Sequence, residues 1–211
     1  SRTFQTVDQH LQLAASGLQA MQRERNANQD SVSAILDEQL VDLPFIRAVW
    51  VLDASGRTVF DSEADSFGGN RADREYFQIY QQRPSTGFHV SAAVRSRSSG
   101  TWQINASRPI RARDGTLTGV IVAAVEPSYF DQLWRGIDLG PGGAIALFRS
   151  DGVLMMRSPV QDTAMGNVFA DLPLFAELQK APQGIFSVTS AFDRRIRMTA
   201  YRSLGAYPAL V

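Results

Sequence analysis

The chain has 211 residues, of which 44% are hydrophobic and 20% charged, and its 21 basic residues balance its 21 acidic residues. This composition is typical of a globular protein with a sizeable core, and zero net charge argues against a nucleic-acid partner. The lack of cysteine excludes disulfides, zinc–thiolate sites and cysteine nucleophiles. No apolar run reaches the roughly 18 residues of a membrane span and no signal peptide is present, so we expect the chain to be part of a longer protein.

The first 44 residues have the apolar spacing of helices. Spacings of three and four predict one apolar seam, formed by Phe4, Val7, Leu11, Ala14, Leu18 and Met21. A second apolar set at 32–43 follows a polar stretch and ends before Pro44, because the residue before a proline disfavours helix. The seam has two interpretations: it packs on the chain's own core, or it also pairs with a second copy.

From Phe45 the pattern changes to that of strands. Residues 48–53 and 57–62 are predicted to form a hairpin around Gly56. Asp73 is the predicted N-cap of a helix that ends at Gln82. Short turns separate three further strands, 87–94, 101–110 and 116–125, so we expect an antiparallel sheet with a helix covering one face.

The order of these elements repeats in the second half. A predicted helix at 128–137 and a glycine-rich loop at 140–143 precede a second hairpin at 144–158, a helix at 172–179 and strands at 184–190 and 196–204, with a last strand entered at 206–211. Gly56 and Gly152 lie 96 residues apart, and Gly87 and Gly184 lie 97 apart. Two tandem copies of one module account for these offsets.

We therefore predict an α+β fold in four parts. Residues 1–44 form the N-terminal helical region and residues 45–126 the first module. Residues 127–143 form a connecting helix and loop, and residues 144–211 form the second module with a truncated final strand. Each module is an antiparallel sheet with covering helices.

One string of motifs resembles a known family. It begins with Asp73-Arg74-Glu75-Tyr76-Phe77 and continues through Trp102-Gln103-Ile104, Ser107-Arg108-Pro109-Ile110, Asp114-Gly115 and Glu126-Pro127-Ser128-Tyr129-Phe130. The string resembles the double Cache (PDC, PAS-like) sensor domains of bacterial transmembrane receptors, most closely those of diguanylate cyclases and histidine kinases, over nearly the whole chain. The resemblance implies a periplasmic domain of an inner-membrane protein, with a membrane-distal first module that holds the ligand, a membrane-proximal second module and flanking membrane helices outside this sequence.

A cup for a small polar ligand needs apolar walls and a few converging polar groups. The first module offers such side chains at the start of its helix and on its strands, and the candidate ligand residues are Arg74, Tyr76, Phe77, His89, Trp102, Asn105, Arg108 and Glu126. An arginine there holds a carboxylate through two parallel hydrogen bonds. Alternation puts Trp102 and Arg108 on one strand face and Asn105 on the other.

In amino-acid-binding members of the family, an Arg-x-aromatic-aromatic element joins a later Tyr-x-Asp pair and a final Asp. Arg74-Glu75-Tyr76-Phe77 matches the first element, whereas residues 88–92 and Glu126 depart from the others. We therefore expect a small polar or anionic ligand, such as a carboxylate or an amino acid. The structural alternatives are a surface ion pair for Arg74, core packing for the aromatic residues and helix capping for Glu126.

The remaining patterns bear on other functions. No nucleotide-binding, zinc-protease or serine-hydrolase motif is present, so we expect no enzymatic activity, no cofactor and no metal. Arg194, Arg195 and Arg197 indicate a solvated hairpin, or a contact with anionic lipid head groups. The leading hypothesis is a ligand-sensing domain of a diguanylate cyclase or histidine kinase. The alternative is a ligand-free interaction module that forms a homodimer through the N-terminal helix.

Overall fold

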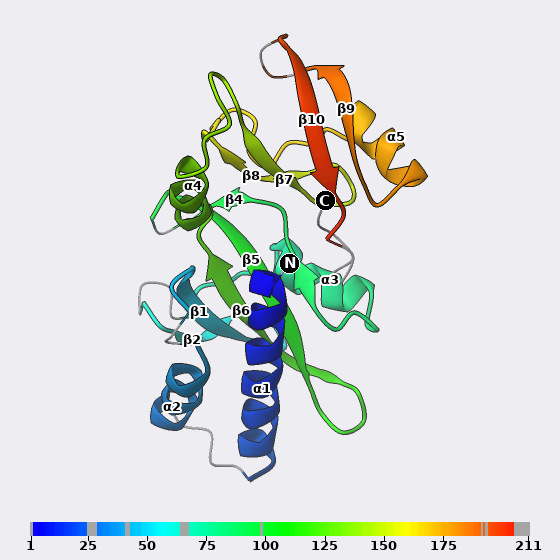
Figure 1. The fold of residues 1–211 in the computed structure, drawn as a ribbon. Helices are drawn as coiled ribbons and strands as arrows, with labels where there is room; N and C mark the ends of the chain where they lie inside the picture. The colour runs from blue at the N-terminus through cyan, green and yellow to red at the C-terminus, as the bar shows by residue number, and fades with distance from the viewer. Residues whose placement is uncertain are drawn as a thin grey trace. The chain divides into compact units, whose positions relative to one another are not determined.

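The computed structural model describes residues 2–24, 29–40, 43–63, 68–97, 99–190, 192 and 194–204 (Figure 1). It forms two compact units, Arg2–Phe130 and Asp131–Val211. The last predicted strand, at 206–211, lies outside the described residues. Over the part of the chain that is described, no helix has the length and apolar character needed to cross a bilayer.

The first unit is built on an antiparallel sheet with the order β2-β1-β6-β5-β3, and β4 pairs with β5. Its strands are β1 Ile46–Asp53, β2 Thr58–Asp61, β3 His89–Val90, β4 Val94–Arg95, β5 Trp102–Arg111 and β6 Leu117–Val125. The central strand β6 is buried on both faces from Val120 to Val125. A strand buried on both faces needs a layer on each side of the sheet, and helices supply both layers. The predicted α+β class is thus confirmed.

Two helices open the first unit, α1 Arg2–Glu24 and α2 Gln29–Leu40. The predicted seam of α1 is buried against β5 and β6 of the same chain, through Phe4, Val7, Leu11, Ala14 and Leu18. Packing on the chain's own core, the first interpretation of the seam, is confirmed. The buried seam is therefore already occupied within one copy.

The opposite face of the sheet is covered by α3, Glu75–Gln82, which buries Tyr76, Phe77 and Tyr80. The prediction that Asp73 caps this helix is wrong, because the N-cap residue is Arg74, without a side-chain cap. Asp73 instead accepts a hydrogen bond from Arg97 at 2.5 Å. That contact holds the pKa of the Asp73 carboxyl below its usual value.

The strand predicted at 87–94 is divided into β3 and β4. Ser91 still donates its amide to Asn105 of β5, but the Ala92 amide donates to the side chain of Glu75 at 2.9 Å. Alternate amides of an antiparallel strand point away from the partner strand, and the Glu75 carboxylate accepts from such an amide. The ladder is interrupted because β4 pairs with β5 in a register shifted by one residue from that of β3.

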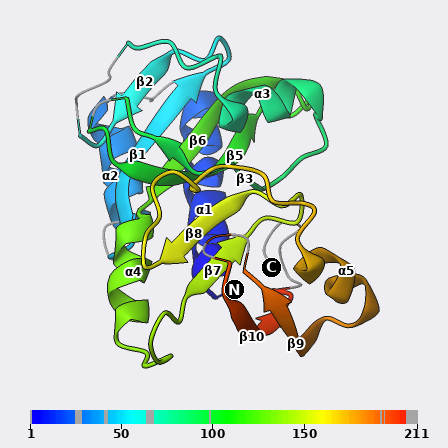
Figure 2. The ribbon, with the colours of Figure 1, turned by 90° about the horizontal axis from the view of Figure 1, so that it is seen from above.

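Over its described residues, the second unit contains two antiparallel hairpins and one complete helix. Its elements are β7 Ile145–Phe148, β8 Leu154–Ser158, α5 Pro173–Lys180, β9 Gln183–Thr189 and β10 Ile196–Arg202, and α4 Pro127–Arg135 spans the boundary between the units. Within the described residues, β7 pairs with β8 and β9 pairs with β10. Figures 1 and 2 both show α5 beside β9.

The first hairpins of the two units share local details. The register of β1 with β2 shifts between Val51 and Leu52, and the register of β7 with β8 shifts 96 residues later, between Leu147 and Phe148. Glycine in the left-handed region makes the turn in both, at φ 81° and 90°, as such a turn requires. The two hairpins are therefore built in the same way.

Candidate functional site

The two faces of β5 separate the predicted site residues. The Ser107 side chain lies on the face that α3 covers, because its hydroxyl lies 3.0 Å from the Tyr80 hydroxyl. Asn105, two residues earlier, shares that face. Arg108 lies on the opposite face, where its guanidinium binds Asp8 of α1. The structure thus brings Asn105 to the α3 side of the sheet and directs Arg108 to the α1 side.

Small side chains and one large ring form the surface beneath α3. Asn105 lies opposite Ala124 in the sheet, and Ala124 lies opposite Ala48. Two residues along β1, the ring of Trp50 meets Tyr76 of α3 edge-on, with ring centroids 5.8 Å apart. The sheet surface beside the Trp50 indole therefore carries the short side chains of Ala48, Ala124 and Asn105.

Several buried donors in this region lack an acceptor. Five N–H or O–H groups have no hydrogen-bond partner among the described residues: Arg47 Nε, Trp50 Nε1, Arg74 Nε, Tyr76 Oη and Asn105 Nδ2. An unsatisfied buried polar group costs about 1–3 kcal/mol, and native proteins contain few of them. A bound molecule rich in hydrogen-bond acceptors would satisfy donors of this kind. These five residues are called the donor set below.

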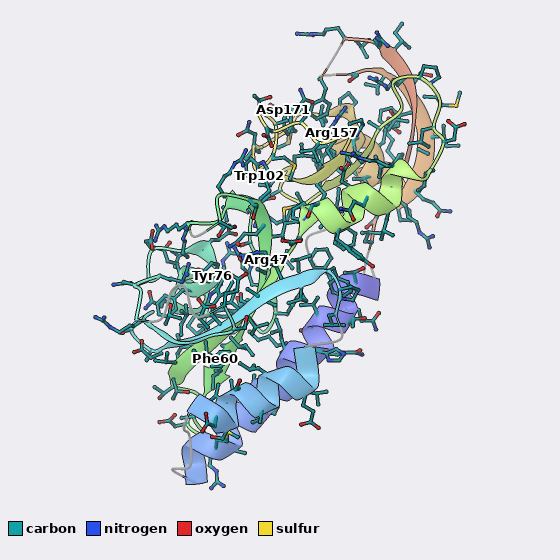
Figure 3. All side chains as sticks on the ribbon, turned by 90° about the vertical axis from the view of Figure 1, so that its left-hand side faces the viewer. Arg47, Phe60, Tyr76, Trp102, Arg157 and Asp171 are labelled. Carbon is teal, nitrogen blue, oxygen red and sulfur yellow. The ribbon has the colours of Figure 1, made fainter. Side chains whose placement is uncertain are left out.

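Arg47 reaches this side of the sheet through a β-bulge. The register of β1 with β6 shifts between Ile46 and Ala48, so Arg47 is an extra residue on β1. A bulge redirects the side chain that it inserts. The Arg47 guanidinium accordingly donates to Gln103, which precedes Asn105 on the same face of β5, at 3.0 Å. Figure 3 labels Arg47 on β1 and Tyr76 on α3.

Carboxylates flank one end of the donor set. Arg47 binds Glu63 at 2.5 Å, and its Nε lies 3.7 Å from Glu126. Gln103 donates in turn to Asn105 at 2.9 Å. The charged group is thus linked to Asn105 by side-chain hydrogen bonds, which orient the Asn105 amide.

Positive charge surrounds the Tyr76 hydroxyl. Burial raises the pKa of Tyr76, and the charges of Arg71 and Arg74, together with the nearby N–H groups of Arg71 and Trp50, oppose that rise. The Arg71 guanidinium also lies over the Trp50 ring, 5.2 Å from its centroid, a cation–π arrangement. Two guanidinium groups and two aromatic side chains together suit a small anion with an apolar part.

The other predicted residues have neighbours outside the donor set. Phe77 is completely buried in the core beneath α3. His89 Nε2 lies 3.0 Å from the Glu75 carboxylate. The Trp102 ring lies 4.8 Å from the guanidinium carbon of Arg95. Glu126 approaches the donor set only through Arg47.

The sequence analysis missed Arg47, Trp50 and Arg71. A signal for Trp50 exists, because strand alternation places it with Ala48 on one face, and a buried indole N–H needs a partner. Arg47 gives no such signal, since simple alternation assigns it to the other face. Within the described residues no three His, Asp or Glu side chains gather as metal ligands, and N–H donors bind anions rather than cations.

Comparisons with known proteins agree with this architecture. A family model described as a dCache_1-like histidine kinase sensor domain matches residues 127–211. The extracellular domain of the putative histidine kinase rpHK1S-Z16 is 30% identical over 99% of this chain and 85% of that chain, with a TM-score of 0.86.

Two more distant structures share the fold. The periplasmic sensory domain of the Campylobacter jejuni chemoreceptor Tlp1 is 12% identical over 99% of this chain and 86% of that chain, with a TM-score of 0.79. The ligand-binding domain of the Pseudomonas fluorescens chemoreceptor CtaA, solved in complex with L-isoleucine, is 15% identical over 93% of this chain and 84% of that chain, with a TM-score of 0.55. No curated protein matches the chain.

Proposed function

The chain belongs to the double Cache family of extracytoplasmic histidine kinase sensor domains, and from that premise we propose that its first unit binds a small organic carboxylate as a signal. The observation that carries the proposal is the donor set. An ionised carboxylate only accepts hydrogen bonds, so it complements N–H and O–H groups that lack acceptors. A free amino acid belongs to this ligand class.

Arg74 and Tyr76 are the central residues of the proposed site. Arg74 is the N-cap residue of α3, and Tyr76 follows in the first turn. A guanidinium binds a carboxylate with two parallel hydrogen bonds, and the Tyr76 hydroxyl and the Asn105 amide supply further donors. The structure of CtaA with L-isoleucine is a precedent for an amino acid in this fold.

The proposed context is a transmembrane receptor of the inner membrane. The two units correspond to two tandem modules, the first distal from the membrane and the second proximal. Ligand binding in the distal module shifts a two-state arrangement that flanking helices transmit to a kinase or diguanylate cyclase output. The relatives are sensor domains rather than catalytic domains, which supports a binding role for the chain itself.

Dimerisation without a ligand was the alternative hypothesis. It rests on the α1 seam and on the parts of the amino-acid-binding motif that this sequence lacks. The seam itself is buried within one chain. A dimer through α1 would therefore use the exposed face of that helix rather than the seam. The ligand-binding hypothesis has the stronger structural support, because packing of the Trp50 and Tyr76 rings does not satisfy the polar atoms of the donor set.

The test is calorimetric titration of the chain with a panel of amino acids and short carboxylates. Arg74→Ala and Asn105→Leu are each expected to weaken the best ligand at least tenfold, because each removes donors. Arg108→Ala is the matched control. It removes an arginine on the opposite face of β5, so we expect lower stability but unchanged affinity.

A ligand present at 100 times its dissociation constant should also stabilise the folded chain by about 2.7 kcal/mol, visible as a rise in the melting temperature. A panel that gives no saturable binding at millimolar concentration contradicts the proposal. Equal loss of affinity in Arg74→Ala and Arg108→Ala would contradict the assignment to the α3 side.

A further inference from the structure

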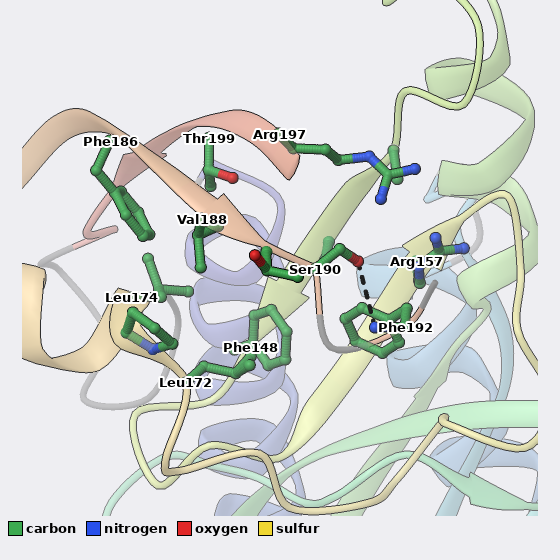
Figure 4. Close-up of a pocket in the computed structure, with 14 residues that line it drawn as sticks. Phe148, Arg157, Leu172, Leu174, Phe186, Val188, Ser190, Phe192, Arg197 and Thr199 are labelled. Atoms are coloured by element: carbon green, nitrogen blue, oxygen red, sulfur yellow. Dashed lines mark hydrogen bonds between the residues drawn. The ribbon is translucent and has the colours of Figure 1, made fainter. Parts of the chain in front are cut away.

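The second unit contains a cavity of about 140 Å³ beside β7, β9, β10 and the first turn of α5 (Figure 4). Its apolar wall includes Phe148, Leu174, Phe186 and Val188. A dry cavity of about 150 Å³ in another protein binds benzene. The space therefore suits one aromatic ring or a short aliphatic chain.

Two arginines give this cavity a positive side. Arg157 of β8 and Arg197 of β10 line it, and none of its described lining residues is acidic. The Arg157 guanidinium lies 5.2 Å from the Phe192 ring centroid, and Arg197 Nε donates to the Gly142 carbonyl at 3.1 Å. In Figure 4 the guanidinium groups of Arg157 and Arg197 lie on the same side of the cavity. A guanidinium has five N–H donors, so it can hold a carbonyl and an anion together.

The cavity in the second unit exists because a small residue lies where the first unit has a large one. Trp50 of β1 and Ala146 of β7 lie 96 residues apart, each just before the equivalent register shift of its hairpin. This correspondence rests on the tandem modules proposed above. Trp50 packs its ring against Tyr76, whereas Ala146 contributes one methyl group to the cavity wall. The large Trp50 side chain fills the space beside β1, whereas the small Ala146 side chain leaves the space beside β7 empty.

The second unit also has a charged side chain where the first unit has the Asn105 amide. His89 of β3 pairs with the residue two after Asn105, and Phe186 of β9, 97 residues later, pairs with the residue two after Arg197. Asn105 and Arg197 therefore occupy corresponding positions. Compared with the first unit, the second unit has Arg197 in place of an amide and Ala146 in place of an indole ring. Its cavity therefore suits a different ligand.

We propose that this cavity is a second ligand site, for a small monocarboxylate with a compact apolar body. The carboxylate binds Arg157 and Arg197, and the apolar body lies between Phe148, Leu174 and Val188. Benzoate and propionate are the probes of this class, and benzamide is the uncharged match of benzoate.

The test is titration of the full chain with each probe. Ala146→Trp fills the cavity without removing a polar group, and Arg197→Gln removes one charge, so each is expected to weaken benzoate binding at least tenfold. Arg195→Gln is the matched control, because Arg195 is an exposed arginine close by that does not line the cavity. It is expected to leave the affinity unchanged.

Arg74→Ala separates this site from the one in the first unit, and it should leave benzoate binding unchanged. Binding that Arg74→Ala removes and Ala146→Trp retains overturns this inference while supporting the proposed function. Failure of both carboxylates to bind, or equal affinity for benzamide, overturns it as well. If Ala146→Trp does not fold, Val188→Phe fills the same cavity and takes its place in the comparison.

Discussion

Tyr76 and Tyr80 lie one turn apart on α3, and both are buried beneath it. The Tyr80 hydroxyl donates to the Ser107 carbonyl and lies 3.0 Å from the Ser107 hydroxyl. The Tyr76 hydroxyl has no hydrogen-bond partner within the described ranges. The two tyrosines thus lie on the same helix and are both buried, but among the described residues only the Tyr80 hydroxyl forms a hydrogen bond.

This difference predicts opposite effects of one substitution. Tyr80→Phe removes a made hydrogen bond and is expected to destabilise the ligand-free chain by about 1 kcal/mol. Tyr76→Phe removes an unsatisfied hydroxyl, so we expect unchanged or higher stability together with weaker carboxylate binding. Urea denaturation with and without ligand measures both effects. A loss of stability in Tyr76→Phe as large as in Tyr80→Phe would show that its hydroxyl serves the fold instead.

Sequence reasoning located the helix start at Arg74 and Tyr76 but not the residues that complete the site. Arg74 and Tyr76 follow from local pattern, because a polar residue and an aromatic pair open a helix. Arg47 joins them only through a bulge, and bulges leave no period in the sequence. The side of Arg108 does not follow from the sequence, because alternation defines two faces of a strand without saying which one α3 covers.

At the scale of elements, α1 is held by its seam. Leu11 is 0% exposed and Leu13, two residues later, is 57% exposed. Helix spacing explains the contrast, since residues two apart point in different directions. The same helix therefore carries a buried position and an exposed one of identical chemistry.

The seam predicts that Leu11→Asp unfolds the first unit, because it buries an unpaired charge in an apolar contact. A loss of more than about 3 kcal/mol is expected. Leu13→Asp makes the same change on the exposed side and should stay within about 0.5 kcal/mol of the parent. Circular dichroism during urea denaturation gives both values. If Leu11→Asp stayed folded and only lowered the mass in light scattering, the seam would be an interface between copies.

Most helices and strands are predicted by the spacing of apolar residues and by the glycine, proline and polar residues between them. Glycine turns and the change from helical to alternating spacing predicted the hairpins at 48–62 and 144–158, and the structure has both. The pattern at 87–94 predicts one strand, whereas the structure divides it by a one-residue shift in its pairing with β5. Such a shift depends on the partner strand and leaves no local signal.

At the scale of the whole molecule, the chain consists of two compact units. Leu52 in the first and Leu154 in the second are both completely buried. Units with separate cores are expected to unfold in separate steps.

A matched pair of substitutions tests this expectation. Leu52→Ala and Leu154→Ala should each cost about 2–5 kcal/mol, and each should lower the melting transition of its own unit only. Differential scanning calorimetry resolves the transitions. A single transition that either variant lowers by the same amount would instead indicate one cooperative body.

The hairpins of the second unit also bear on how the protein behaves at high concentration. Within the described residues, β7 pairs only with β8 and β10 only with β9, so each hairpin has backbone groups without a strand partner among those residues. Ile196 and Met198 of β10 are 81% and 79% exposed. Open edges with apolar side chains are templates for strand addition by other molecules. Pairing of such an edge with a second copy is therefore the expected route of self-association at high concentration.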